Sequence, residues 1–366
     1  MDSPFSRLVI KVGSGLLIGP DRQANTSFAA SLAGDIAALR GAGTEVLLVS
    51  SGAIALGAPS IGLAERSQRL DELQAAASVG QVRLAQLWQS QFAVHGLAAA
   101  QLLLTLGDTE SRRRYLNALD TIRVLLSRGV IPVVNENDTV ATDEIRYGDN
   151  DGLAARVAQM VDADAMVLLS DVDGLYTAHP SHADARLVPR VTDIDDNIDA
   201  MVSEARSTWG SGGMHSKVAA ARLATAAGVD VFVTNGTQTS CIAHWLAGGP
   251  ATHFVASARP ERARKRWIAG TLRPAGKLWL DAGACAALRS GKSLLPVGVQ
   301  RVDGSFQRGD TVVLLDERGE EIGRGLTACD DGEARSLAGR PGDRSARRAA
   351  LVHRNDLVLT ERVANS

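Results

Sequence analysis

Two lysines in this sequence stand beside glycine-rich segments, and both could bind an anion. Lys11 is the last residue but one of the apolar run Leu8–Val12, which is followed by Gly13-Ser14-Gly15, whereas Lys217 directly follows the segment Gly212-Gly213-Met214-His215-Ser216. An ammonium group and the backbone N–H groups of a glycine-rich turn can bind the same phosphate. Each segment alone is also compatible with an ordinary turn, because glycine-rich turns are common. Together the two segments favour a polyphosphate site.

Amide and carboxylate side chains crowd two further segments. Asn135-Glu136-Asn137-Asp138 follows an apolar run, and Gly148-Asp149-Asn150-Asp151 precedes a helical pattern. Such groups can bind the ammonium of an amino acid, hold a metal–nucleotide complex or orient lysines. Their spacing does not fit a calcium-binding loop. The alternative is an Asx-rich turn followed by a helix N-cap.

Small and hydroxyl-bearing residues follow two other apolar runs, at Ser50–Gly57 and Ser170–Thr177. In the first, a carboxylate or phosphate could approach a helix N-terminus closely, although a plain serine N-cap would also explain it. The second is typical of a loop on the nucleotide side of a site. The sequence lacks a Walker A segment, the signatures of protein kinases and a GxGxxG after the first strand.

These groups suit the transfer of a phosphoryl group to a carboxylate. That reaction requires both anions to be held in line and the transferred charge to be neutralised. Lys11 and Lys217 could supply the cations, and an acidic residue between them could orient both. No general base is needed, because a side-chain carboxylate is already ionised at pH 7.

The elements that must position these residues alternate along the first ~255 residues, where short apolar runs are followed by longer helical patterns. This alternation predicts an α/β fold with a mostly parallel sheet sandwiched by helices. In such sheets ligands bind outside the carboxyl ends of the strands. The predicted strands are Leu8–Val12, Glu45–Val49, Ala98–Leu104, Val130–Val134, Ala165–Leu169 and Val229–Val233. The predicted helices are Phe28–Arg40, Leu70–Val94, Tyr115–Ser127, Asp151–Val161 and Lys217–Ala227.

Near residue 260 the alternation of apolar runs and helical patterns ends. We predict a catalytic domain over residues 1–258, a charged, proline-bearing linker over 259–273 and a small β-rich domain over 274–366. The short alternating runs of the last domain are Lys277–Leu280, Leu294–Val302 and Asp310–Leu315.

Composition restricts the class of protein. The chain has 366 residues, a net charge of −2 and 45% hydrophobic residues. Its apolar runs are far shorter than the roughly 18 residues of a membrane span, and it begins without a signal-peptide pattern, so we expect a cytoplasmic protein that does not enter membranes. Its cysteines, Cys241, Cys285 and Cys329, are too far apart for a CxxC pair, which argues against a zinc site or a disulfide framework.

Five segments in this order resemble the amino-acid kinase family: KVGSG, SSGAIALG, NENDTV with GDND, LLSDVDGLYT and GSGGMHSK. The combination of NEND, GDND and GGMxxK resembles the members of that family that phosphorylate glutamate, the glutamate 5-kinases. The C-terminal part resembles a PUA domain, and the resemblance covers nearly the whole chain.

The resemblance also implies residue roles. Lys11 and Lys217 would contact phosphates and stabilise the transition state, and Asp151 would orient them. The glutamate site would contain Ser51, Gly52, Asn135, Asp138, Asp149 and Asn150. The ATP site would contain Lys11, Gly13, Ser170, Asp171, Ser211, Gly212, Gly213, Met214, His215, Ser216 and Lys217.

Magnesium with ATP, feedback inhibition by proline and a homo-oligomer, a dimer or tetramer, are further expectations from the resemblance. No residue is assigned as a ligand of Mg²⁺.

Two alternatives stay open at this point. Another enzyme of the same fold would act on acetylglutamate, aspartate, carbamate or UMP. An RNA-binding protein would use the PUA-like domain and the arginine-rich stretch around Arg340, Arg344, Arg347, Arg348 and Arg354. The slightly negative net charge and the lack of an aromatic stacking motif beside these arginines disfavour RNA.

Overall fold

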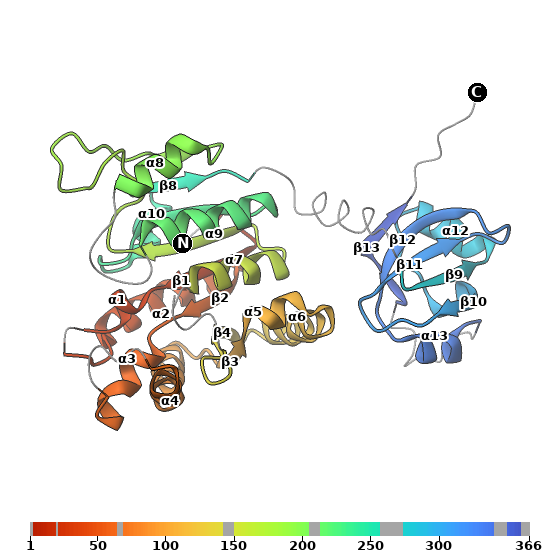
Figure 1. The fold of residues 1–366 in the computed structure, drawn as a ribbon, viewed down its shortest axis with the longest axis horizontal. Helices are drawn as coiled ribbons and strands as arrows, with labels where there is room; N and C mark the ends of the chain where they lie inside the picture. Colours follow the sequence, from red (N-terminus) through yellow and green to blue (C-terminus); the bar gives the residue numbers. More distant parts are fainter. Residues whose placement is uncertain are drawn as a thin grey trace. The chain divides into compact units, whose positions relative to one another are not determined.

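The computed structural model describes residues 3–19, 21–63, 69–141, 150–204, 213–256, 274–339 and 350–359. The chain divides into two compact units, each with its own sheet (Figure 1). The predicted boundaries at residues 258 and 274 border a segment outside the described ranges, so they stay a prediction.

The first unit is built on a mostly parallel sheet. Among the described residues this sheet has eight strands, in the order β3-β4-β2-β1-β5-β7-β8-β6. The strands from β3 to β7 run parallel, whereas β8 runs antiparallel to β7 and pairs in parallel with β6. The strands are β1 Arg7–Val12, β2 Glu45–Ser50, β3 Ala99–Leu104, β4 Ile131–Glu136, β5 Ala165–Ser170, β6 Arg190–Val191, β7 Asp230–Asn235 and β8 Ala251–Phe254.

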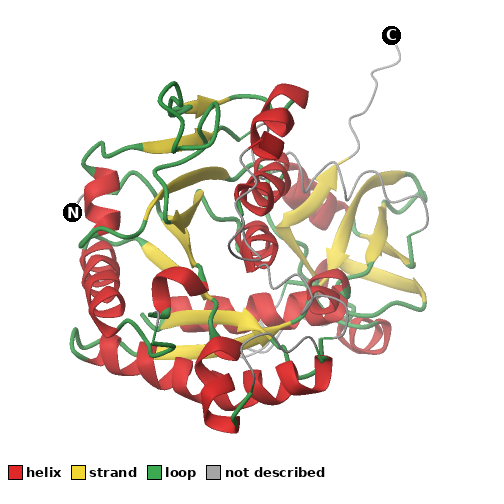
Figure 2. Cartoon of the chain, turned by 60° about the vertical axis from the view of Figure 1, so that its left-hand side comes forward, coloured by secondary structure: helices red, strands yellow, loops and turns green. Residues whose placement is uncertain are grey.

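Helices cover both faces of this sheet (Figure 2), as expected for strands that are apolar along their whole length. The α-helices are α1 Ser14–Leu17, α2 Thr26–Gly41, α3 Ala53–Gly57, α4 Leu70–Ala93, α5 Leu106–Glu110, α6 Arg112–Ser127, α7 Asn150–Met160, α8 Asp196–Glu204, α9 Met214–Ala226 and α10 Cys241–Leu246, with a 3-10 turn at Ala58–Ile61.

Alternate residues of each strand face opposite helix layers. Leu8, Ile10 and Val12 of β1 join one buried cluster with side chains of α2, α4 and α10. Lys11 therefore points to the other face, where α7 packs against β1 and α9 packs against α7. The same alternation applies to the strands on either side of β1, and it sorts the polar residues at their ends between the two faces.

The predicted α/β sandwich is confirmed. The six predicted strands and five predicted helices are present, with bounds that differ by one to three residues. The pattern did not indicate the edge strands β6 and β8 or the helices α8 and α10. β6 has only two residues and β8 has four, and Thr252 and His253 interrupt the apolar run of β8.

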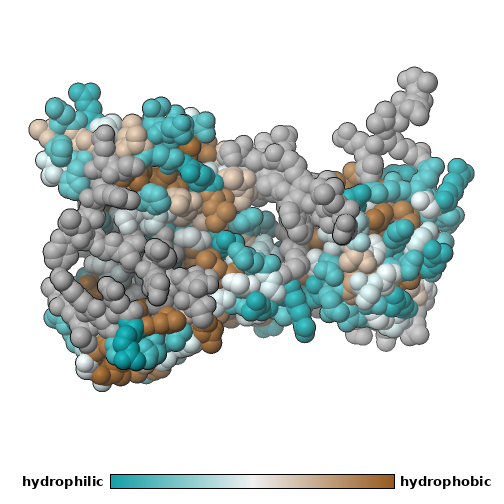
Figure 3. Space-filling view, in the orientation of Figure 1, coloured by the Kyte–Doolittle hydropathy of each residue, from teal (hydrophilic) through white to brown (hydrophobic). Residues whose placement is uncertain are grey.

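The second unit is a five-stranded sheet with two short α-helices. The strand order is β10-β9-β11-β12-β13 among the described residues, and the pairs are antiparallel except β9 with β11. The elements are β9 Gly276–Leu280, α12 Ala282–Arg289, β10 Val299–Gly304, β11 Thr311–Leu315, β12 Glu321–Thr327, α13 Asp331–Leu337 and β13 Val352–Leu359, with a 3-10 turn at Pro296–Gly298. The visible face of this unit is mainly hydrophilic (Figure 3).

Of the alternating run Leu294–Val302, only the second half lies in a regular strand. Pro296 lies in the first turn of the 3-10 helix, and the strand begins only at Val299. Proline has no N–H to give to a strand ladder, and before it only Leu294 pairs, in an isolated bridge with Val352.

In the described residues we find no helix long and apolar enough to cross a membrane. All three cysteines are free and buried.

Candidate active site

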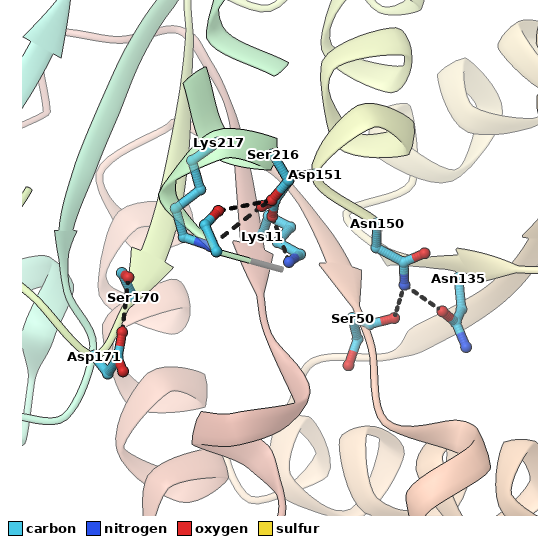
Figure 4. Close-up of polar contacts among 10 residues, drawn as sticks. Lys11, Ser50, Asn135, Asn150, Asp151, Ser170, Asp171, Ser216 and Lys217 are labelled. Carbon is cyan, nitrogen blue, oxygen red and sulfur yellow. Dashed lines mark hydrogen bonds and ion pairs between the residues drawn. The ribbon is translucent and has the colours of Figure 1, made fainter. Parts of the chain in front are cut away.

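Polar side chains gather at the carboxyl ends of β1, β2, β4 and β5, where the first helical turns of α7 and α9 also lie (Figure 4). Two groups of contacts can be distinguished there. One contains the lysines and a carboxylate, and the other is a chain of amides.

Asp151 joins the two predicted lysines in one buried triad. Its carboxylate forms an ion pair with the Lys11 ammonium through Oδ1, and its Oδ2 lies 3.2 Å from Lys217 Nζ. The exposed fractions are 0% for Asp151, 4% for Lys11 and 6% for Lys217. Burial alone would raise the pKa of the Asp151 carboxyl, but the two ammonium groups lower it to about 2. Asp151 is thus ionised at neutral pH, and one carboxylate with two ammonium groups gives the triad a net charge of +1.

Helix α9 presents its N-terminus beside this triad. Gly213 is the extended N-cap and the helix begins at Met214, three residues before the predicted start at Lys217, which is therefore the fourth residue of the helix. Ser216 Oγ donates to Asp151 Oδ2 at 2.8 Å, which ties this first turn to α7. Because the first N–H groups of a helix have no partner within the helix and the dipole is positive there, this end favours an anion.

A chain of amides runs across the other group. Asn150 Nδ2 donates to the backbone oxygen of Ser50 at 3.1 Å and to Asn135 Oδ1 at 2.7 Å. Asn135 Nδ2 in turn donates to Gln81 Oε1 at 2.6 Å. Trp88 Nε1 donates to Ser50 Oγ at 2.9 Å, so α4 contacts the chain at both ends.

The turn after β2 is held tightly between elements. Ser51 N donates to the Val12 carbonyl at 3.1 Å, which links the ends of β2 and β1. Gly52 has a φ of +107°, a conformation that favours glycine, and it is the N-cap of α3. Helices α3 and α4 then cross in backbone contact, because a Cβ on Gly80 would lie 1.7 Å from the Ala53 oxygen.

At the end of β5, Ser170 is buried and Asp171 is exposed, and Ser170 Oγ donates to Asp171 Oδ1 at 3.2 Å. Gly236 N donates to the Ser170 carbonyl at 2.7 Å, so the loop after β7 borders this position. Asn235 Nδ2 donates to Asp173 Oδ1 at 3.0 Å and joins the two loops.

Asp138 lies just beyond β4 and is partly buried. Burial raises the pKa of its carboxyl from 3.8 to about 6. A carboxylate that is poorly solvated is a suitable partner for an ammonium group, because the cation replaces the lost solvation.

The structure thus brings together Lys11, Asp151 and Lys217, and separately Asn135 and Asn150. Gly13 is the N-cap of α1, and an ideal Cβ on it would lie 3.8 Å from Lys11 Nζ. Gly213, Met214, His215 and Ser216 form the start of α9. Asp149, Ser211 and Gly212 lie outside the described residues, as do the predicted RNA-contacting arginines except Arg354.

Three residues with contacts at the site, Gln81, Trp88 and Asn235, were not predicted from the sequence. Trp88 and Gln81 lie within an ordinary helical pattern, where an amide or an indole gives no local signal of a site. Asn235 is the last residue of β7, and a polar residue at the carboxyl end of a parallel strand is a signal of a site in this kind of sheet.

Among the described residues no three His, Cys, Asp or Glu side chains form a group that could hold a metal ion. Asp151 is already neutralised by two ammonium groups. The described residues therefore do not fit a metal held by the protein alone.

Comparison with known proteins gives the family. A model of the amino acid kinase family matches residues 6–235, and one of the PUA domain matches residues 276–348. Glutamate 5-kinase 1 of Rhizobium meliloti (strain 1021) is 52% identical over 364 residues, which cover 97% of this chain and 92% of that protein. Glutamate 5-kinase of Brucella ovis is 50% identical over 362 residues, covering 97% and 96%.

Among solved structures, carbamate kinase from Giardia lamblia bound to AMP-PNP matches with a TM-score of 0.50 and 15% identity, over 69% of this chain and 99% of that one. At that identity the likeness shows the fold alone. The family model spans more than half of the chain, and both relatives match nearly its full length. The chain belongs to the amino acid kinase family and carries a C-terminal PUA domain.

Proposed function

We propose that this protein transfers the γ-phosphoryl group of ATP to the side-chain carboxylate of L-glutamate, forming glutamyl 5-phosphate, the first step of proline biosynthesis. The observation that carries phosphoryl transfer is the buried triad of Lys11, Asp151 and Lys217 at the carboxyl ends of the strands. Glutamate as the acceptor is supported by the names of relatives that are about 50% identical over almost the whole chain.

On the phosphate side, Lys11 and Lys217 would contact phosphate oxygens and neutralise the charge that develops on the transferred group. Asp151 holds both ammonium groups in place, and it stays ionised because they lower its pKa. The first turn of α9, from Gly213 to Ser216 with Ser211 and Gly212 before it, would cradle the ATP phosphates. Ser170 and Asp171 would contact the nucleotide from β5.

On the acceptor side, Asn135 and Asn150 would bind glutamate together with Ser51, Gly52, Asp138 and Asp149. A carboxylate such as Asp138 suits the α-ammonium group of an amino acid. Asn150 and Asp151 are the first two residues of α7, so one helix end would serve both the acceptor and the phosphates.

No general base is required in this mechanism. The γ-carboxylate of glutamate is ionised at neutral pH and attacks as it is. Asp151 is unsuited to accept a proton, because its pKa is about 2 and both of its oxygens face ammonium groups. The protein's contribution is the alignment of two anions and the electrostatic stabilisation of the transferred group.

Mg²⁺ would accompany ATP as part of the nucleotide substrate, held mainly by phosphates and water, and no step above depends on a metal ligated by the protein. Cytoplasmic location, inhibition by proline and a homo-oligomer belong to the same proposal. So does the division into a catalytic domain over 1–258, a linker over 259–273 and the PUA-like region over 274–366.

The test is an assay with hydroxylamine, which traps an acyl phosphate as a hydroxamate. ATP with glutamate should give γ-glutamyl hydroxamate, whereas aspartate should give none. The assay is repeated with acetylglutamate and UMP as acceptors, with phosphate transfer to each followed by ADP release, and with added proline. Equal turnover of acetylglutamate or UMP would refute glutamate as the substrate.

A further inference from the structure

Helix α4 contacts the candidate site through polar side chains that neither the family match nor the sequence motifs assign. Its residues Leu84, Leu87, Trp88 and Phe92 belong to the apolar cluster beneath the sheet. Gln81 lies one turn before Leu84 and reaches Asn135 instead of the apolar cluster.

The position of Asn135 follows from strand alternation. Ile131 and Val133 of β4 join the cluster that contains α4, so Asn135 two residues later points to the same face. On β2, Val46 and Leu48 join that cluster and Ser50 continues their face, where Trp88 donates to it. The face of β2 and of β4 that is apolar further back thus ends in a polar side chain, Ser50 or Asn135. Helix α4 supplies a polar partner to both, through Trp88 and Gln81.

One fixed acceptor determines the orientation of the whole amide chain. The Ser50 backbone oxygen can only accept, so the Asn150 atom that faces it must be Nδ2. The same Nδ2 faces Asn135, which must therefore present Oδ1 and turn Nδ2 towards Gln81. Gln81 completes the chain by presenting Oε1.

Asn150 then has both of its N–H groups in use. Its Oδ1 is the one polar atom of the side chain that no described group engages, so Asn150 offers an acceptor. An ammonium group, which has three donors and no acceptor, suits that atom, whereas a carboxylate would be repelled.

We infer that Gln81 is a positioning residue for the acceptor substrate: its Oε1 accepts from Asn135 Nδ2 and, with the Ser50 oxygen at the other end of the chain, holds Asn135 and Asn150 in place, so that Asn150 presents its carbonyl oxygen to the α-ammonium group of an amino acid. This inference rests on the proposed function. Gln81 does not touch the reacting atoms, and it acts through Asn135.

The test compares variants of the full chain in the hydroxamate assay. Gln81→Met keeps the length of the side chain and removes the acceptor. We expect the KM for glutamate to rise about 10-fold, the effect of one lost buried hydrogen bond, while the KM for ATP and the melting temperature change little. Gln81→Glu keeps an acceptor oxygen and should restore the KM to within about 3-fold of wild type. Gln86→Met, at an exposed position of the same helix, is the matched control and should leave all values unchanged.

Two further measurements protect the test. Gln81→Asn withdraws the amide by one methylene while keeping it polar, so it should raise the KM for glutamate even if Gln81→Met folds poorly. In the Asn135→Leu background Gln81→Met should have no further effect, because the two residues act in series.

If wild type forms the hydroxamate but Gln81→Met and Gln81→Asn keep the wild-type KM for glutamate, the inference is overturned and the proposed function stands. Equal increases of the KM for glutamate and for ATP would also overturn it, since they indicate general damage. Absence of hydroxamate with the wild type refutes the proposed function and this inference with it.

Discussion

Replacement of Lys217 by methionine removes one charge from the buried triad and preserves most of the side-chain volume. Lys217 Nζ lies 3.2 Å from Asp151 Oδ2, and the Lys11 ion pair and the Ser216 hydrogen bond remain in the variant. The net charge of the site falls from +1 to zero. Asp151 stays paired, so the variant does not leave a buried charge without a counter-ion.

The expected losses differ for turnover and stability. A cation that stabilises a transferring phosphoryl group is worth about 10³- to 10⁵-fold in turnover, or about 4–7 kcal/mol. Orphaning a buried charge costs about 3–5 kcal/mol of stability. Because Asp151 keeps two partners, we expect Lys217→Met to cost less than that, about 1–3 kcal/mol. The KM for glutamate should stay within about 3-fold, because the amide chain is untouched.

The assay measures hydroxamate formation at saturating ATP and glutamate, together with urea unfolding. Arg222→Met is the control, because it removes a cation from the same helix where the ion pair with Asp199 is exposed. Its turnover should remain within about twofold and its stability within about 1 kcal/mol of wild type. Turnover of Lys217→Met above a tenth of wild type would contradict the assigned role. So would a rise in the KM for glutamate as large as the loss of turnover.

Three other outcomes are expected. Asp138→Asn should raise the KM for glutamate yet stabilise the protein by about 1–3 kcal/mol at pH 8. In the folded wild type the pKa of this carboxyl is raised from 3.8 to about 6, so its contribution to stability is lost as pH rises through that range. In urea titrations the variant should therefore be stabilised relative to wild type at pH 8 and much less so at pH 4. Gly80→Ala should lower the free energy of unfolding by more than about 3 kcal/mol. Gly41→Ala, in open space at the end of α2, should be neutral or slightly stabilising. Equal melting temperatures of the two variants would contradict the close crossing of α3 and α4. Burial raises the pKa of every cysteine thiol, to about 12 for Cys241 and Cys329, so a thiol reagent should label the native protein slowly and all three positions only after denaturation.

Most of the first unit could be predicted from the sequence because its strands are continuous apolar runs. Such strands lie between two helix layers, and the order of strands and helices then determines where their carboxyl ends meet. The strands β8 and β6 at one edge of the sheet could not be predicted in the same way. β6 is two residues long and β8 is half polar, so their pairing depends on neighbours far away in the sequence.

The candidate site was predictable in part for a related reason. Lys11 and Asp151 stand at a strand end and a helix start, where chemistry is expected. Lys217 stands in a glycine-rich segment, and its pairing with Asp151 is a long-range contact that residue types suggest but do not locate. Gln81 lies in mid-helix, and its contact with Asn135 appears only when the end of β4 is placed beside α4.

Two neighbouring residues of α7 contact the two groups of the site, and their spacing determines which length of acceptor the site can hold. Asn150 and Asp151 are adjacent, and their side chains leave the helix axis about 100° apart. If the ammonium group of the acceptor binds at Asn150 while the phosphates bind around Asp151, the two binding positions are one peptide unit apart. That spacing fixes the distance between the ammonium group and the phosphorus atom that is transferred. An acid shorter by one methylene would hold its carboxylate about 1 Å short, and a misplacement of about 1 Å can cost about 100-fold in rate. The site would then discriminate against a shorter acid without any side chain that blocks it. The fixed spacing of Asn150 and Asp151 at the start of α7 would be enough.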